Sequence, residues 1–594
     1  MKFYKVVLAA FLGTLIALLI VFFIKIGVIT SLISSMSTTE TVATKVKPNS
    51  ILHMKLDYAI PDRTSENRFD AIDFTSIEKK DLSGLNVILR NIENAASDPN
   101  IKGIYLNLGN VPTSSATLQE IRNKLLFFRE SGKFIVSYGE LYSQSAYYIA
   151  SVSDKIFMNP DGMVDIHGMA AQITFYKHLM EKLGVEMQII RGPNNKFKSA
   201  VEPYFLDKMS DANREQMDQL LGSVWGQILV SISQSRNISM EQLNRIADSL
   251  DTYFDAEKAI EYGLVNKLYY KDQVIDELKQ MTGSGDKLSL IGNDNYKKCY
   301  SLDESGSQKI AIIYASGTII DGKAPEGTIG SEILSRTIRK AREDKKVKAI
   351  VLRVNSPGGS ALASSVIGRE VELARAQKPV IVSMGNYAAS GGYWISACSD
   401  YIFADANTLT GSIGVFGTIP NLKTLLNEKI GLTFDVAKTN ANADFGSISK
   451  PLTEFQLAKL QQSVVRTYND FTSMVARNRN LRQSYVDSIG QGRVWSGSDA
   501  LKRGLVDKLG GLEDAIAYAA EKAGITDSYT VVEMPKQKDF MTSLMEEISG
   551  RREDEVQSAI QKELGIFYPY YQGLKSVSEA TGIQARMPFD IVIE

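Results

Sequence analysis

Two stretches of the sequence decide the fold, because one is a copy of the other. Residues 135–157 read IVSYGELYSQSAYYIASVSDKIF, and residues 381–403 read IVSMGNYAASGGYWISACSDYIF. They align without a gap, and ten of the 23 aligned residues are identical. The two stretches lie 246 residues apart, and at the same offset Asp98–Leu108 (DPNIKGIYLNL) matches Asp344–Val354 (DKKVKAIVLRV). Chance is a poor explanation for colinear matches, so we predict a tandem duplication.

Each copy alternates short apolar runs with amphipathic segments. In the second copy, Ile310–Tyr314, Ala349–Val354 and Val380–Met384 are rich in β-branched residues, as the strands of a buried parallel sheet are. Between them, Ser331–Asp344 and Ala361–Gln377 have helical spacing with charged outer positions. This order predicts an α/β fold with right-handed crossovers.

The composition excludes several classes of protein. A chain of 594 residues is too long for a single core. Its 67 basic residues balance 68 acidic ones, so nothing indicates the concentrated basic surface of a nucleic-acid-binding protein. The two cysteines, Cys299 and Cys398, cannot build a disulfide framework or a zinc site, and we expect two free thiols. We expect neither a metal nor a cofactor.

The N-terminus has the pattern of a membrane anchor. Residues 6–24 carry no charge, with Lys2 and Lys5 before them and Lys25 after them. As a helix they cover about 28 Å, close to the ~30 Å hydrocarbon core of a bilayer. No small-x-small cleavage site follows, which favours a retained transmembrane helix over a cleaved signal. The two leading lysines favour a cytoplasmic N-terminus.

These patterns predict six consecutive regions. They are the cytoplasmic N-terminus with the anchor (1–30), a linker (31–50), the first repeat (51–282), a second linker (283–307), the second repeat (308–530) and a helical C-terminal tail (531–594).

The two copies differ where chemistry is expected. In the second copy, Ser390 opens a helix and is followed by two glycines, whereas the aligned residue of the first copy is Gln144, which cannot be an acyl-transfer nucleophile. A helix N-terminus offers free N–H groups and a positive dipole to a developing oxyanion. Taken alone, however, such a serine is more often a helix cap.

A glycine pair supplies a second difference. Asn355–Ser360 reads NSPGGS, but the colinear Gly109–Ser114 reads GNVPTS. A Pro-Gly-Gly segment is often only a turn. Beside a nucleophile it would point a backbone N–H at a tetrahedral intermediate. Gly358 and Gly391 are therefore the candidate oxyanion-hole residues. Gly359 is the alternative candidate for this role.

A serine nucleophile needs a base. The three histidines, His53, His167 and His178, all lie in the first copy, so no histidine is local to Ser390. Among the familiar bases for a serine nucleophile, a neutral lysine is then the remaining candidate. Burial can make a lysine neutral, since it lowers the pKa of an amine. The composition does not choose among the lysines.

Four motifs together resemble a known family: MGNYAASGGYWIS, RVNSPGGS, TLTGSIGVFG (Thr408–Gly417) and KSAVEP (Lys198–Pro203). The family is signal peptide peptidase A, or protease IV, in its long duplicated form. NSPGG alone also occurs in the wider Clp-protease and crotonase-like superfamily. The resemblance implies two Clp-protease/crotonase-like domains, each a ββα superhelix, after the transmembrane helix.

The resemblance also assigns the site. The serine of ASGG is the family's nucleophile, which corresponds to Ser390, and the lysine of KSAVEP is its general base, which corresponds to Lys198. Lys196, two residues earlier, is the alternative lysine. Ser412 resembles a family serine that holds the lysine in place. The segment aligned with Lys198 in the second copy, Ala441–Phe445, contains no lysine. Each copy thus keeps one member of the dyad, and the site is expected where the copies meet.

The implied function is a membrane-anchored Ser-Lys endopeptidase that degrades hydrophobic peptides such as cleaved signal peptides. The implied setting is a homotetramer on the outer, periplasmic face of the bacterial cytoplasmic membrane, held in the lipid bilayer by residues 6–24. Its partners are peptide substrates and not nucleic acid. Two other classes stay open: a crotonase-like acyl-CoA enzyme and a non-catalytic membrane scaffold.

Overall fold

A computed structural model describes most of the duplicated body. The described residues are 45–65, 72–73, 78–79, 82–285, 287–300, 308–325, 327–526, 529–537 and 582–587, together with Gly13 and Leu564. The expected anchor, residues 6–24, lies outside them apart from Gly13. Within this described part of the chain, no helix combines the length and apolar character that crossing a membrane requires.

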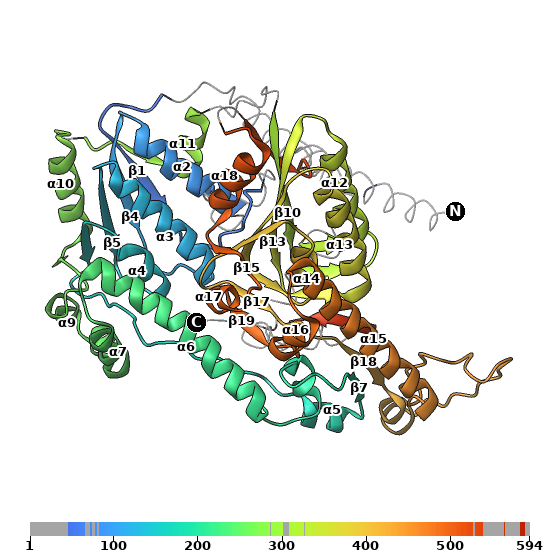
Figure 1. Cartoon of the computed structure of the whole chain (residues 1–594). Helices are drawn as coiled ribbons and strands as arrows, with labels where there is room; N and C mark the ends of the chain where they lie inside the picture. Colours follow the sequence, from blue (N-terminus) through green and yellow to red (C-terminus); the bar gives the residue numbers. More distant parts are fainter. Residues whose placement is uncertain are drawn as a thin grey trace, which may run out of the picture.

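Two sheets of matching strand order form the centre of the two repeats (Figure 1). The first has the spatial order β8 (Lys267–Leu268), β6 (Lys155–Met158), β5 (Phe134–Gly139), β4 (Ile101–Asn107), β1 (Ser50–Lys55) and β9 (Leu290–Gly292). The second contains β20 (Lys508–Leu509), β16 (Tyr401–Ala404), β15 (Val380–Ala389), β13 (Val347–Ser356), β10 (Lys309–Ser316) and β21 (Thr530–Met534) in the same order. All of these neighbours pair in parallel. The second sheet also has β17 (Leu409–Gly411), which pairs with the end of β15, and β19 (Val494–Ser496), which pairs with β17. The α/β class and the duplication predicted from the sequence are therefore confirmed.

Helices cover the faces of both sheets. On the first sheet lie α2 (Leu85–Ser97) and α3 (Ser115–Glu130), and on the second lie α12 (Ser331–Glu343), α13 (Ala361–Arg375) and α18 (Leu512–Ala523). In α12 the buried Leu334, Ile338 and Ala341 follow the spacing of one helical face, as the sequence pattern predicted. This cover explains why the strands are apolar on both faces.

A third sheet joins the repeats. Its order is β12 (Thr328–Gly330), β11 (Thr318–Ile320), β14 (Gly358–Ser360), β22 (Gly582–Arg586), β18 (Phe416–Asn421) and β7 (Glu186–Arg191). Only β7 comes from the first repeat, and it pairs antiparallel with β18 over six residues, from Phe416 opposite Arg191 to Asn421 opposite Glu186. The pairing carries the segment after β7 to the second repeat.

Two of the expected regions differ in the structure. The linker 283–307 contributes β9, which pairs with β1 as β21 pairs with β10, and the short helix α11 (Asn293–Tyr296). The tail, expected to be helical, contributes the strand β22, while its charged stretch 541–564 lies outside the described residues apart from Leu564. A two- to five-residue strand is specified by distant pairing partners, which local periodicity does not show.

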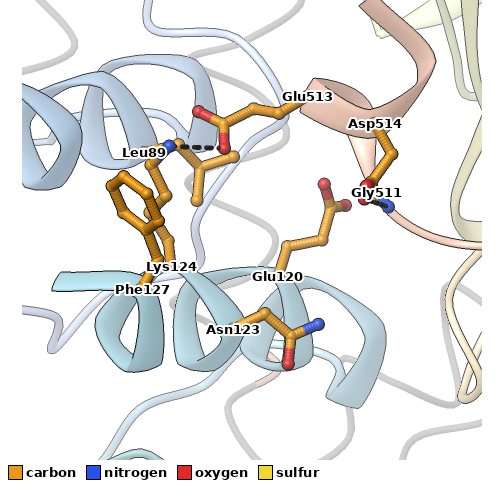
Figure 2. Close-up of a pocket in the computed structure, with 8 residues that line it drawn as sticks. All are labelled: Leu89, Glu120, Asn123, Lys124, Phe127, Gly511, Glu513 and Asp514. Atoms are coloured by element: carbon orange, nitrogen blue, oxygen red, sulfur yellow. Dashed lines mark hydrogen bonds and ion pairs between the residues drawn. The ribbon is translucent and has the colours of Figure 1, made fainter. Parts of the chain in front are cut away.

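A buried ion cluster lies where the repeats touch. The fully buried Arg353 of β13 reaches Glu120 of α3 at 2.5 Å and Asp62 at 2.8 Å, and both carboxylates belong to the first repeat. Breaking such a buried pair costs about 3–5 kcal/mol, because a charge is left without a partner. Figure 2 shows the pocket beside it, where Lys124 pairs with Glu513 at 2.8 Å. The ion cluster therefore ties the two halves together.

Candidate active site

Ser390 occupies a strained turn between a strand and a helix. Strand β15 ends at Ala389, and α14 (Gly391–Ala397) begins one residue after Ser390. Ser390 has φ 55° and ψ −111°, a conformation that costs of order 1–3 kcal/mol for a residue with a side chain. Its N–H donates to the carbonyl of Gly411 at 2.8 Å, which holds the turn. Strain of this kind gathers at functional sites because the surrounding fold maintains it.

Lys198 reaches Ser390 from the first repeat. It lies seven residues after the end of β7, and its side chain is fully buried. Its Nζ is 3.0 Å from Ser390 Oγ, 2.9 Å from Ser412 Oγ and 3.2 Å from the carbonyl oxygen of Ser412. The structure thus brings together the three side chains that the sequence singled out, across the boundary between the repeats.

The site favours an uncharged amine. The hydrogen-bond partners of Lys198 Nζ are hydroxyl and carbonyl oxygens, and none of them is a carboxylate. Burial lowers the pKa of Lys198 well below its ordinary value, because removal from water disfavours the ammonium form. A neutral amine within hydrogen-bond reach of a hydroxyl is placed to accept its proton.

The alternative lysine lies at the surface. The side chain of Lys196 is 59% exposed, and its Nζ is 4.0 Å from a carboxylate oxygen of Glu215. It also lies over the ring of Phe197. Geometry therefore separates two lysines that stand two residues apart in the sequence.

Two glycines that the sequence analysis missed make room for the lysine. A Cβ on Gly492, which has φ +84°, would lie 2.6 Å from Cα of Lys198. A Cβ on Gly414 would lie 3.2 Å from Cδ of Lys198. The side chain of Lys198 thus passes close to both glycines, and a larger residue at either position would crowd it. For Gly492 a signal was present. Tyr253–Leu268 (YFDAEKAIEYGLVNKL) resembles Val494–Leu509 (VWSGSDALKRGLVDKL), and extending this alignment upstream places Asp251 opposite Gly492.

The expected oxyanion-hole glycines lie side by side. Gly358 has φ +100°, and a Cβ there would lie 2.7 Å from the amide nitrogen of Gly391. The N–H of Gly358 donates to Ser356 Oγ at 3.2 Å, within its own turn. The amide nitrogen of Gly359 lies 3.2 Å from the position of a Cβ on Gly391. The geometry favours Gly359 as the oxyanion donor beside Gly391. The sequence had offered Gly359 only as the alternative to Gly358, which shapes the turn.

The corresponding place in the first repeat has a structural role. Gln144 Oε1 accepts from the N–H groups of His167 and Gly168 at 3.2 and 3.1 Å, and Nε2 donates to the carbonyl of Gly168 at 3.0 Å. A glutamine amide thus bridges the loop that aligns with the Ser412 loop. The first repeat keeps the scaffold around this position, but a glutamine stands where the second repeat has Ser390.

Comparison with known proteins agrees with this geometry. The model of "Peptidase family S49" matches residues 127–284 and 372–526, one segment in each repeat. "Protease 4" of Salmonella typhi is 41% identical over 447 residues, which cover 73% of this chain and 71% of that protein. "Protease 4" of Haemophilus influenzae is 37% identical over 453 residues, with 72% and 71% covered. "Serine protease SPPA, chloroplastic" of Arabidopsis thaliana is 33% identical over 558 residues, with 91% and 78% covered. The chain therefore belongs to peptidase family S49 and is a serine protease.

Proposed function

We propose that this serine protease is a membrane-anchored endopeptidase that works with a Ser390–Lys198 dyad and degrades hydrophobic peptides such as cleaved signal peptides. The observation that carries the dyad is the 3.0 Å approach of Lys198 Nζ to Ser390 Oγ, with both residues fully buried. The substrate class, the anchor at residues 6–24, the periplasmic placement and the homotetramer rest on the resemblance of the four motifs.

The geometry supports the following mechanism. Neutral Lys198 takes the proton of Ser390 as Oγ attacks the carbonyl carbon of the scissile bond. The N–H groups of Gly391 and Gly359 stabilise the oxyanion. Lys198 then gives the proton to the leaving amine. A water molecule, deprotonated in turn by Lys198, attacks the acyl-enzyme and releases Ser390. The 2.9 Å hydrogen bond between Lys198 Nζ and Ser412 Oγ holds the amine within reach of Ser390 Oγ.

Substitution of the dyad tests this mechanism. Ser390→Ala and Lys198→Ala should each lower hydrolysis of an apolar fluorogenic peptide to background. Lys196→Ala is the matched control, because that lysine is exposed. Circular dichroism should show that the folds are intact. Full activity of either dyad variant would refute the assignment.

The pH profile tests the base independently. Lys198 must lose its proton before it can act, so activity should rise with pH through a single ionisation. Burial lowers the pKa of Lys198, so that rise should fall well below the ~10.4 of a free lysine. A flat profile between about pH 6 and 10 would contradict a lysine base.

Membership of a peptidase family argues against both alternative classes. An acyl-CoA enzyme would need a thioester site and would not hydrolyse peptides. A scaffold would not react with a serine-directed phosphonate. Mass spectrometry of the labelled protein should locate that adduct on Ser390.

A further inference from the structure

A short turn of the second repeat ends at Arg493, directly before β19, and binds both segments that hold the amine of Lys198. The carbonyl of Gln491 accepts from the N–H of Phe197, the residue before Lys198, at 2.9 Å. The carbonyl of Arg493 accepts from the N–H of Ser412 at 2.7 Å. Gln491 has φ 53°, a left-handed conformation that surrounding contacts must maintain. The turn therefore links the segment of the base to the segment of the serine that holds it.

The side chain of Arg493 adds a second connection. Its guanidinium lies over the ring of Phe197, 4.3 Å from the centroid, and over the ring of Trp495, 4.5 Å from the centroid. It also pairs with Glu215 at 3.1 Å and donates to Gln219, and both of these belong to α6 (Asp211–Arg236) of the first repeat. A guanidinium is planar, so it can lie on aromatic rings and still form bonds at its edge. Arg493 thus joins Phe197 to β19 and to a helix of the other repeat.

The segment that carries Lys198 depends on such contacts. Residues 192–198 form neither helix nor strand, so regular backbone hydrogen bonds do not fix their place. Phe197 is 7% exposed, and the guanidinium of Arg493 covers its ring. A lysine side chain is long and flexible. Its amine stays 3.0 Å from Ser390 Oγ only if the backbone that carries it is held.

We propose that Arg493 is a positioning residue for the general base: it holds Phe197 in place, and thereby keeps the amine of Lys198 between Ser390 and Ser412 in a pocket closed to water. The guanidinium acts through Phe197 and not on the reacting atoms. This inference rests on the proposed Ser390–Lys198 dyad. It adds that an arginine of the second repeat sets the position of a base that belongs to the first.

Arg493→Met in the full-length chain tests the proposal. The variant keeps a long side chain and loses the planar cation. Since a misplacement of about 1 Å can cost about 10²-fold in rate, we expect kcat for a fluorogenic peptide to fall at least about tenfold at unchanged KM. Burial is what lowers the pKa of Lys198, so water that reaches a loosened amine should raise this pKa toward ~10.4. The rise of activity with pH should therefore move upward by about one pH unit.

Arg503→Met is the matched control. The guanidinium of Arg503 also lies over Trp495, 3.5 Å from the centroid, but it donates to the carbonyl of Asp499 in α17 (Gly497–Lys502). This variant should keep the wild-type kcat and pH profile. Equal losses of kcat in the two variants, or an unchanged pH midpoint in Arg493→Met, would overturn the proposal, because Arg493 would then only support the fold.

A double substitution tests whether Arg493 acts through Phe197. Phe197→Leu keeps an apolar side chain but removes the ring, so it should lower kcat and shift the pH profile as Arg493→Met does. The double variant should lose no more than the larger single loss, because residues that act as a unit are not additive. Losses that multiply would contradict an action through Phe197.

Two more variants keep every outcome decisive. Arg493→Lys retains a cation beside Glu215 and should shift the pH profile in the same direction even if Arg493→Met does not fold, because an ammonium has no plane to lie on the ring. Wild-type kinetics in Arg493→Lys would overturn the proposal. Lys198→Ala separates the inference from the dyad on which it rests. An inactive Lys198→Ala beside a fully active Arg493→Met refutes the positioning role alone, whereas an active Lys198→Ala refutes the dyad as well.

Discussion

The buried amine of Lys198 should leave a measurable trace in the pH dependence of folding. In the folded protein, burial lowers the pKa of Lys198 well below its ordinary value. In the unfolded chain the same amine titrates at about 10.4. Between these two values the unfolded state binds one proton more than the folded state. The free energy of unfolding of the wild type therefore gains a term that rises with pH.

The magnitude of this term follows from the proton count. One proton of difference corresponds to about 1.4 kcal/mol per pH unit. Lys198→Met keeps the length of the side chain and removes the titration. The stability of the variant minus that of the wild type should therefore fall by about 1.4 kcal/mol per pH unit across the window and become constant above about pH 10.4. The lost contacts to Ser390 and Ser412 add only an offset that does not depend on pH.

The difference in the free energy of unfolding between Lys198→Met and the wild type can be measured by urea unfolding. Tryptophan fluorescence follows the unfolding at several pH values between about 7 and 10. Lys196→Met is the control, since that lysine is 59% exposed, and its difference from the wild type should stay constant. Parallel stability curves for the wild type and Lys198→Met would show that Lys198 is not held neutral. The base assignment would then lose its physical ground.

Three further substitutions test the rest of the site and its support. Ser412→Ala removes the 2.9 Å contact with Lys198 and should lower kcat about tenfold at unchanged KM; an unaltered kcat would contradict the positioning role. Gly358→Ala puts a methyl group 2.7 Å from the amide nitrogen of Gly391 at φ +100°, so kcat/KM should fall at least about 10²-fold, and near-wild-type turnover would refute the tight packing. Arg353→Met should destabilise the protein by about 3–5 kcal/mol in thermal or urea unfolding. The exposed control Arg369→Met should stay within about 0.5 kcal/mol, and equal effects would show that the buried cluster does not tie the repeats together.

Long regular elements could be predicted from the sequence because their patterns are local. The apolar run at Val380–Met384 predicted a strand, and the structure extends it to Ala389, directly before Ser390. The short strands β9 and β22 were missed. Their few residues carry no periodicity of their own, and their strand state depends on neighbours far away in the chain.

The site could be predicted in part for a similar reason. The asymmetry between Gln144 and Ser390 marked the nucleophile position, because a duplicated scaffold shows which copy has changed. Resemblance to a family then selected Lys198. Gly414 and Gly492 were missed, since their role is to leave space for a side chain that arrives from the other repeat.

The sequence by itself determined the duplication, the α/β class and the contrast between Gln144 in one copy and Ser390 in the other, because these are properties of residue order and local pattern. The choice of Lys198 came from the resemblance to a family. Only the tertiary structure decided that Lys198 lies 3.0 Å from Ser390, and that β22 pairs with β14 and β18. The reason is that strand pairing and burial depend on residues far apart in the chain. The pairing of β7 with β18 brings Lys198 to the second repeat, and burial lowers the pKa of its amine.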